Sequence, residues 1–485
     1  MKVLMLGWEF PPHISGGLGT ACYGLTRGLH EHGVEVVFVV PRRFGDEDRR
    51  FLTVVGCNDA RTPIREGQVP SPAQPPRQGG APASPSPSSG TPASVAAASG
   101  VAPESAPAGT NVATFVPVDS SLYAYATETT YHAGEPDVAR RRVISEPERR
   151  TNREPPPEPV GAVDNRVPTA APLSRQFLSG RYGHNLLHEV ARYRDIVTEI
   201  AASHEFDVIH AHDWMTYPAA AALRARYRRP LVVHLHATEY DRSPNGPNHA
   251  ICDLERAGLL SADRVICVSQ YTASIAERRY GIDPAKLRVV YNAVVPPRAS
   301  RSDNPRTLHA PLVLFLGRVT QQKGPEFFLR AARRVVDAKP SARFVMAGSG
   351  DMLVSMIEES ARLGLAENFH FTGFLTGTDV ERMYAMADVY VMPSVSEPFG
   401  IAPLEAMALD TPVIVSRQSG VSEVLNNALK VDFWDVERLA SYILALLDEP
   451  ALRQEIVARG RQELRTMQWS ARGEHVLQIY RELVP

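Results

Sequence analysis

The segment from Glu397 to Glu405 places two carboxylates around a turn and the start of an expected helix. It reads Glu-Pro-Phe-Gly-Ile-Ala-Pro-Leu-Glu and follows a short apolar run. The backbone N–H groups of Phe399, Gly400 and Ile401 would then lack helical partners and could bind an anion or sugar hydroxyls. Carboxylates in the same place accept hydrogen bonds from hydroxyls. The alternative for such an acid pair alone is a solvated loop with a glutamate that only complements the helix dipole.

A second loop brings two cations between an expected strand and an expected helix. It reads Gly-Arg-Val-Thr-Gln-Gln-Lys-Gly over residues 317–324 and contains Arg318 and Lys323. A guanidinium and an ammonium at the C-terminal edge of a sheet suit a diphosphate, because they neutralise the charge that develops as a leaving group departs. Two cations in a loop are otherwise often just solvated, but the position after a strand favours the binding role.

The glycine-rich loop Ser-Gly-Gly-Leu-Gly at 15–19 resembles a phosphate-binding turn, with Gly16 and Gly17 as the closest-approach positions. It lacks the G-x-G-x-x-G spacing of dinucleotide sites, so a plain strand-to-helix turn is the alternative. The run Asp-Glu-Asp at 46–48 matches the D-x-D pattern of metal-dependent glycosyltransferases of another fold. Its charged surroundings predict a solvated loop instead.

Histidines end two expected strands, in His210-Ala-His-Asp-Trp and in His234-Leu-His236. A histidine at the carboxyl edge of a strand can reach a ligand, whereas a structural histidine with its hydrogen bonds satisfied is the commoner outcome. The spacing is also compatible with metal ligation. Because no third group of ligands accompanies these residues, no metal site is predicted.

Composition limits the class of protein. The chain has 485 residues, a hydrophobic fraction of 44% and a formal net charge of −2, which gives no footprint for nucleic acid or an anionic membrane. No apolar run approaches the roughly 18 residues of a membrane span, so we expect a soluble cytoplasmic protein without membrane insertion. The cysteines predict neither a disulfide framework nor a structural zinc site. They are Cys22, Cys57, Cys252 and Cys267.

Alternating short apolar strands and helices predict an α/β protein with two doubly wound, Rossmann-like domains that face a central cleft. The N-terminal domain is expected to comprise residues 1–60, 111–134 and 175–297. Two segments interrupt it. Residues 61–110 are rich in Pro, Ala and Ser and are expected to be disordered, and residues 135–174 to be a flexible insertion.

The second domain is expected over residues 298–466. The segment 467–485 is expected to form a helix that crosses back to the first domain.

These residues together resemble glycosyltransferase family 4 and the related bacterial glycogen and starch synthases, which have the GT-B fold. Both ordered halves carry the resemblance, and only the two insertions fall outside it. The motifs are the glycine loop, His-Ala-His-Asp-Trp, Tyr-Asn-Ala-Val at 291–294, the E-x7-E segment from Glu397 to Glu405, and Met-Gln-Trp-Ser at 467–470. The lysine that those synthases carry just before the glycine loop is absent, since Ile14-Ser15 stands there.

The resemblance implies a role for each site residue. Arg318 and Lys323 would hold the donor diphosphate, and Glu405 would bind the ribose. Glu397, with the amides from Phe399 to Ile401, would hold the donor sugar. His236 would meet the sugar near the reacting carbon. The glycine loop, through Gly16 and Gly17, would approach the donor phosphate or the acceptor.

The resemblance also implies the reaction: transfer from a nucleotide diphosphate sugar with retention at the anomeric carbon, without metal or cofactor. An α-1,4-glucan such as glycogen is the favoured acceptor, and a cell-surface glycan, a lipid or a small metabolite is the alternative. An epimerase or phosphorylase, and a non-catalytic carbohydrate-binding scaffold, are the remaining readings. The intact Arg318, Lys323, Glu397 and Glu405 count against the scaffold. The nucleotide and the oligomeric state are left open.

Overall fold

The structure is a computed structural model. It describes residues 1–14, 16–59, 178–180, 182–183, 185–244, 246–298, 300–301 and 309–484. Both expected insertions and residues 111–134, expected to be part of the first domain, therefore lie outside the described residues. No helix in the described ranges is long and apolar enough to span a membrane.

The first lobe is built on a seven-stranded sheet in which every neighbouring pair is parallel. Its order is β3-β2-β1-β4-β5-β6-β7, the doubly wound arrangement in which the chain moves outward from β1 in both directions. The strands are β1 (Lys2–Leu6), β2 (Glu35–Val40), β3 (Thr53–Gly56), β4 (Val208–His212), β5 (Leu231–Leu235), β6 (Arg264–Cys267) and β7 (Leu287–Val289). The helices of this lobe are α1 (Gly17–Glu31), α3 (Leu186–Ile200), α4 (Tyr217–Tyr227), α5 (Glu239–Arg242), α6 (His249–Ser261) and α7 (Gln270–Tyr280).

The second lobe repeats this plan with a six-stranded parallel sheet in the order β10-β9-β8-β11-β12-β13. Its strands are β8 (Leu312–Leu316), β9 (Arg343–Ala347), β10 (Phe369–Gly373), β11 (Val389–Met392), β12 (Val413–Ser416) and β13 (Leu429–Val431). Its helices are α8 (Pro325–Ala338), α9 (Leu353–Arg362), α10 (Thr378–Met386), α11 (Ala402–Ala408), α12 (Val421–Val424), α13 (Val436–Asp448) and α14 (Pro450–Leu464). The two doubly wound domains expected from the sequence are confirmed.

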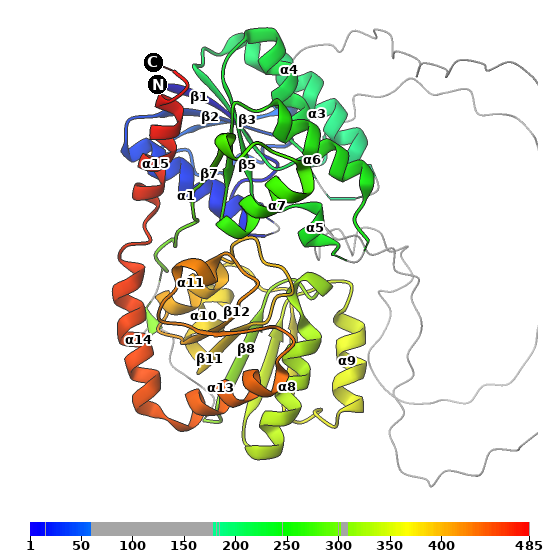
Figure 1. The fold of residues 1–485 in the computed structure, drawn as a ribbon, viewed down its shortest axis with the longest axis vertical. Helices are drawn as coiled ribbons and strands as arrows, with labels where there is room; N and C mark the ends of the chain where they lie inside the picture. Colours follow the sequence, from blue (N-terminus) through cyan, green and yellow to red (C-terminus); the bar gives the residue numbers. More distant parts are fainter. Residues whose placement is uncertain are drawn as a thin grey trace, which may run out of the picture. The chain divides into compact units, whose positions relative to one another are not determined.

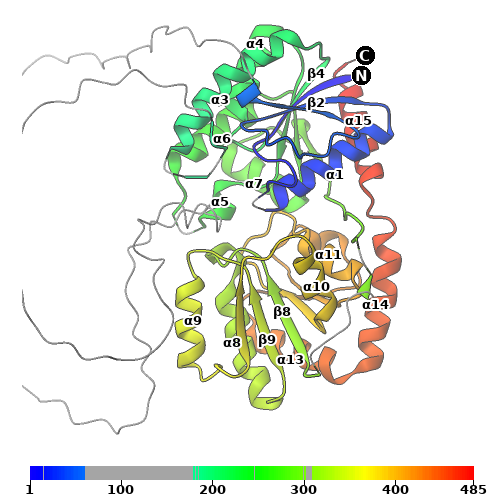
Figure 2. The same cartoon turned by 180° about the vertical axis from the view of Figure 1, so that it is seen from behind.

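Helices cover both faces of each sheet, as Figures 1 and 2 show from opposite sides. Alternate residues along a strand therefore enter different cores. In β1, Leu4 packs with residues of α3, α4 and α7, whereas Val3 and Met5 pack on the opposite face with residues of α1 and the last helix. Strands buried on both faces read as continuous apolar runs, which explains their visibility in the sequence.

The last helix, α15 (Trp469–Arg481), belongs to the first lobe although the second lobe precedes it in the chain. It lies beside α1, and Figure 1 shows the red α15 next to the blue α1. The crossing is very close: a Cβ on Gly28 would lie 2.1 Å from the Trp469 carbonyl oxygen, and one on Gly473 would lie 2.3 Å from the Gly28 carbonyl carbon. Glycine is needed at both positions because any side chain would separate the helices.

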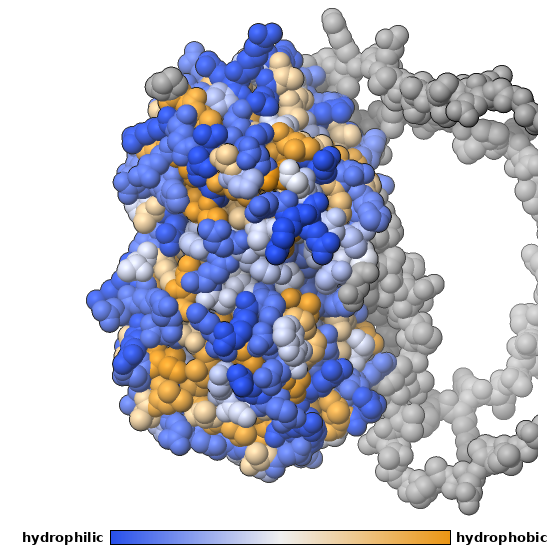
Figure 3. Space-filling view, viewed as in Figure 1, coloured by the Kyte–Doolittle hydropathy of each residue, from blue (hydrophilic) through white to orange (hydrophobic). Residues whose placement is uncertain are grey.

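Two short strands went unrecognised in the sequence. β3 forms the edge of the first sheet beside β2, and β13 forms the edge of the second beside β12. On the face of the molecule that Figure 3 shows, apolar areas lie among hydrophilic ones.

Candidate active site

The loop between β11 and α11 is held in one conformation by its backbone. Gly400 has φ +97°, and a Cβ there would lie 3.0 Å from the Met392 sulfur. The Glu397 N–H donates to the Gln418 carbonyl at 2.9 Å, and the Gly420 N–H donates to the Glu397 carbonyl at 2.9 Å. This bridge to the segment after β12 fixes where the Glu397 side chain leaves the backbone.

Phe399, Gly400 and Ile401 directly precede α11, with Ile401 at its N-cap. Within the described ranges none of the three donates a hydrogen bond to a backbone carbonyl. Gly400 gives this turn the positive φ that the sequence alone did not reveal. The expectation that these amides are available to a ligand stays a prediction, and the geometry is compatible with it.

Lys323 and Glu397 meet directly. The Lys323 ammonium donates to Glu397 Oε2 and forms an ion pair in which the Glu397 side chain is only 8% exposed. Ser394 Oγ donates to the same carboxylate oxygen at 3.1 Å. Lys323, expected to hold the diphosphate, and Glu397, expected to hold the sugar, therefore neutralise each other's charge in this structure.

The loop that carries Lys323 (residues 317–324) is joined to the loop that carries Glu397 (residues 393–401) by backbone contacts. Gly324 has φ +64°, and a Cβ there would lie 2.3 Å from the Pro393 carbonyl oxygen. The Val395 N–H donates to the Gln322 carbonyl at 2.9 Å. Gln322 is buried, and its side-chain oxygen accepts from Arg318 Nη2 at 2.9 Å, which directs the guanidinium along the same loop.

Glu405 lies in the first turn of α11 and is half-buried. The Tyr384 hydroxyl donates to its Oε2 at 3.2 Å. Burial raises the pKa of Glu405, and the nearby Glu381 carboxylate adds to the rise while the Tyr384 hydrogen bond opposes it.

In the first lobe, Gly16 caps α1 without a side chain, and Gly17 is the first residue of the helix. A Cβ on Gly17 would lie 3.9 Å from Ile401 Cδ1 of the second lobe, so the glycine loop and the Glu397 loop approach each other. The neighbouring Gly19 N–H donates to the buried Glu9 carboxylate at 3.1 Å.

His236 follows β5 and is held from two sides. Its backbone N–H donates to Asp213 Oδ1 at 2.8 Å, and its ring Nε2 lies 2.9 Å from His212 Nδ1. Burial lowers the pKa of His236 to about 3, so the ring is neutral at physiological pH. Among the described residues, His236 makes no recorded hydrogen bond to Arg318, Lys323, Glu397 or Glu405.

Asp213 is a residue of this site to which the sequence assigned no role. It follows β4 with φ +57° and is buried, and burial raises its pKa to about 6. The Arg242 guanidinium lies 3.7 Å from its carboxylate and opposes that rise. Its place directly after two histidines at a strand end was visible in the sequence, but the bond to the His236 backbone was not.

The first lobe also touches the Glu397 loop through the start of α7. Ser269 Oγ donates to the Pro398 carbonyl at 2.5 Å and accepts from the Thr272 N–H, so one side chain both caps α7 and holds the loop. Ser396 Oγ donates to Asp241 Oδ1 at 2.5 Å and lies 2.9 Å from the Tyr271 hydroxyl. None of these contacts was predicted, because they join residues more than a hundred positions apart in the chain.

The Asp-Glu-Asp run is not a simple solvated loop. Glu47 is buried and accepts from the N–H groups of Phe44 and Gly45 at 2.6 and 3.0 Å, which shapes the turn. Asp48 accepts from Tyr23 and Arg50. The expectation of a solvated loop was wrong for Glu47, because a carboxylate can replace the missing partners of turn amides.

Three family models match the chain. The model described as "Glycosyl transferases group 1" matches residues 298–463, "Glycosyltransferase Family 4" matches 143–298, and "Starch synthase catalytic domain" matches 2–68.

Among curated relatives, the glycogen synthase of Mycobacterium tuberculosis is 30% identical over 309 residues, covering 61% of this chain and 73% of the relative. The D-inositol 3-phosphate glycosyltransferase of Thermomonospora curvata is 28% identical over 371 residues, covering 68% of this chain and 84% of the relative. Among solved structures, the sucrose-phosphate synthase of Thermosynechococcus elongatus superposes with a TM-score of 0.64 at 17% identity, covering 99% of this chain and 98% of that one.

Proposed function

The chain belongs to the group 1 and family 4 glycosyltransferases, with the GT-B fold, and on that premise we propose that it transfers a hexose from a nucleotide diphosphate sugar to a glycan. The favoured reaction is elongation of an α-1,4-glucan with glucose, with retention at the anomeric carbon and without a metal ion. The starch synthase model over the first residues and the glycogen synthase relative support the glucan acceptor.

The observation that carries the proposal is the ion pair between Lys323 and Glu397 beside the N–H groups of Phe399 to Ile401. A donor diphosphate brings its own negative charge to Lys323. Glu397 would then exchange the ammonium for sugar hydroxyls, as carboxylates at such positions do. One ion pair therefore keeps both side chains neutralised before the donor binds and releases both to it.

Departure of the nucleotide develops negative charge on the phosphate oxygen that leaves the sugar. Lys323, Arg318 and the amides at the start of α11 would stabilise that charge. The same oxygen would accept the proton of the incoming hydroxyl on the same face of the sugar, which retains the configuration. His236, neutral because burial lowers its pKa, would offer a hydrogen bond to the sugar without adding a competing positive charge.

A small-metabolite acceptor is the second candidate. The relative described as a D-inositol 3-phosphate glycosyltransferase, of which this chain covers 84%, supports it. The absence of a lysine before the glycine loop, where Ile14 and Ser15 stand, supports it as well.

The test is donor turnover by the purified chain. ADP-glucose, UDP-glucose and GDP-mannose are each supplied with and without glycogen, in the presence of a chelator. Nucleotide release that requires glycogen and resists the chelator supports the glucan synthase. Slow hydrolysis of one donor, indifferent to glycogen, supports the second candidate. Absence of turnover with every donor would contradict the proposal.

A further inference from the structure

Four histidines share one face of the first sheet. His210 and His212 are two residues apart on β4 and therefore lie on the same face of the sheet. His234, near the end of β5, is the register partner of His212, and His236 follows β5. Within the described ranges, the buried histidine nitrogens without a hydrogen-bond partner are Nε2 of His210, Nε2 of His212 and both nitrogens of His234. Buried polar groups are nearly always satisfied, so this face has imidazole nitrogens to offer a ligand.

Two sets of side chains bring ligand atoms within 4.8 Å of one another: His210 with His212 and His234, and Cys22 with His212 and His236. The orientation of the rings distinguishes the two sets as possible ion sites. The His210 and His212 rings are stacked, with centroids 4.4 Å apart and 15° between their planes. A nitrogen lone pair lies in the plane of its ring, so stacked rings direct their lone pairs along parallel planes that do not meet at one ion.

The His212 and His236 rings are arranged differently. Nδ1 of His212 and Nε2 of His236 are 2.9 Å apart, while the ring centroids are 5.2 Å apart. The two nitrogens therefore point toward each other and share one proton. A metal ion bound by both would replace that proton, and the ring that gave it up would carry it on its other nitrogen.

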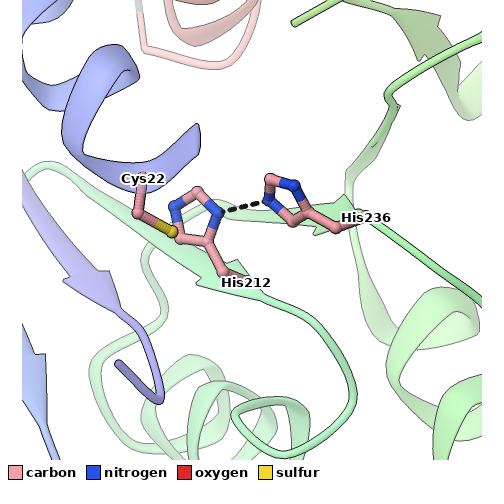
Figure 4. A group of neighbouring side chains, drawn as sticks. All are labelled: Cys22, His212 and His236. Carbon is pink, nitrogen blue, oxygen red and sulfur yellow. Dashed lines mark hydrogen bonds between the residues drawn. The ribbon is translucent and has the colours of Figure 1, made fainter. Parts of the chain in front are cut away.

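The third ligand is Cys22, which the sequence analysis did not connect with the histidines. It lies on the buried face of α1, and Figure 4 shows its sulfur beside the His212 ring, with His236 on the other side of that ring.

One sulfur and two imidazole nitrogens form the donor set that Zn²⁺ prefers, and His236, which is only half-buried, leaves a fourth position open. Bond lengths of about 2.3 Å to sulfur and about 2.0–2.1 Å to nitrogen place tetrahedral ligand atoms about 3.3–3.6 Å apart. Binding would therefore move the two nitrogens apart by a few tenths of an ångström from their present 2.9 Å. The sulfur, which lies within 4.8 Å of both nitrogens, would turn toward the ion.

We propose that Cys22, His212 and His236 bind a thiophilic divalent cation, best fitted by Zn²⁺, and that the bound ion inhibits sugar transfer by withdrawing His236 from the donor. Binding breaks the S–H bond of Cys22 and releases its proton to the buffer, with no change of oxidation state. The binding part stands on the three side chains alone. The inhibitory part rests on the proposed function.

The binding part is tested by titrating the full chain with Co²⁺ and then with Zn²⁺, without any donor. A thiolate ligand gives Co²⁺ a near-ultraviolet charge-transfer band, and we expect this band to saturate at one ion per chain and to disappear when Zn²⁺ is added. Cys22→Ser, which keeps the size of the side chain, should abolish the band and weaken Zn²⁺ binding at least about tenfold. His212→Ala should weaken it similarly.

The matched control is Cys57→Ala, which removes another buried thiol of the first lobe and should leave the band intact. Circular dichroism of each variant shows whether it has folded. A wild-type chain without the band, or a Cys22→Ser variant that binds Zn²⁺ as tightly as the wild type, would overturn the proposal.

The inhibitory part is tested by adding Zn²⁺ to the donor assay. Turnover by the wild type should fall and return with chelator, while Cys22→Ser should turn over normally and resist Zn²⁺. Equal inhibition of both proteins, or tight binding without inhibition, would overturn this part. Absence of turnover without metal would contradict the proposed function instead, and the cobalt titration would still decide the site.

Discussion

At the scale of single residues, Lys323 has two competing partners: the Glu397 carboxylate that it holds in this structure and the diphosphate that it is proposed to hold in the reaction. Lys323→Ala should lower turnover at least about 100-fold, the scale of losing one electrostatic contact to a developing charge. Glu405→Ala, which removes the carboxylate proposed to bind the ribose, should also lower turnover at least about 100-fold, because the donor is no longer held in position. Initial rates at saturating donor measure this. Lys339→Ala, at the opposite end of α8 in a surface pair with Asp448, is the control. Near-normal rates in both site variants would contradict the site assignment.

Ionisation of the Glu405 side chain should lower the free energy of unfolding, so the stability of the chain should depend on pH. Burial raises its folded-state pKa above the unfolded value, so ionisation disfavours the folded state, and the cost appears as pH rises through the folded-state pKa. Glu405→Gln keeps an oxygen for the Tyr384 hydroxyl but cannot ionise. We expect the variant to melt above the wild type at pH 8 and with it at pH 4, while losing turnover. A variant that melts lower at pH 8 would contradict this reading.

The sequence predicted site residues by type and position, and that prediction did not include their partners in the fold. Lys323 and Glu397 are separated by 74 positions, and nothing in either motif predicts that they pair. Asp213 was visible as a carboxylate after a strand, yet its role depends on a positive φ and on a bond to the His236 backbone. Partners of this kind follow from the tertiary fold, which local pattern does not contain.

At the scale of elements, the start of α7 fixes the loop that carries Glu397. Ser396→Ala should destabilise the chain by about 1–3 kcal/mol, because Asp241 Oδ1 would be buried without its hydroxyl donor. Tyr271→Phe removes only a bond to the Ser396 hydroxyl and should cost about 0.5–1.5 kcal/mol. Urea unfolding of both variants measures the difference. A larger loss in Tyr271→Phe would show that Asp241 finds another donor.

The crossing of α1 and α15 has no room for a side chain. Gly28→Ala should lower the free energy of unfolding by about 1–3 kcal/mol, since the new methyl group overlaps the Trp469 carbonyl and forces the helices apart. Gly246→Ala is the matched control, because a Cβ there has nothing within 4 Å. Equal stability of the two variants would show that the helices separate without cost.

Elements with strong apolar periodicity were predicted closely, and the exceptions have a common cause. β3 and β13 contain four and three residues and lie at sheet edges, where a strand has a neighbouring strand on one side only. Among the edge strands, β7 was predicted although it too has three residues, because the apolar run around it continues beyond the strand. The four residues of α5 are equally short. A pattern of period two or 3.6 cannot be detected over so few positions.

At the scale of the whole molecule, the segment 61–110 is expected from its composition to contribute nothing to either core. Deleting it should change the melting temperature by less than the roughly 2–4 °C that 1 kcal/mol produces in a domain of this size. Differential scanning calorimetry measures the shift. A large drop would show that these residues do contribute to the folded state.

The order in which a ribosome releases the chain conflicts with the order in which the lobes are completed. Val476, Ile479 and Tyr480 of α15 pack into the core beneath β1, and the Tyr480 hydroxyl is the hydrogen-bond partner of His210. A nascent chain can therefore finish its second lobe while the first still exposes the apolar face of α1. Until α15 emerges, that face is open to chaperones and to other chains, so the lobe that is synthesised first is completed last.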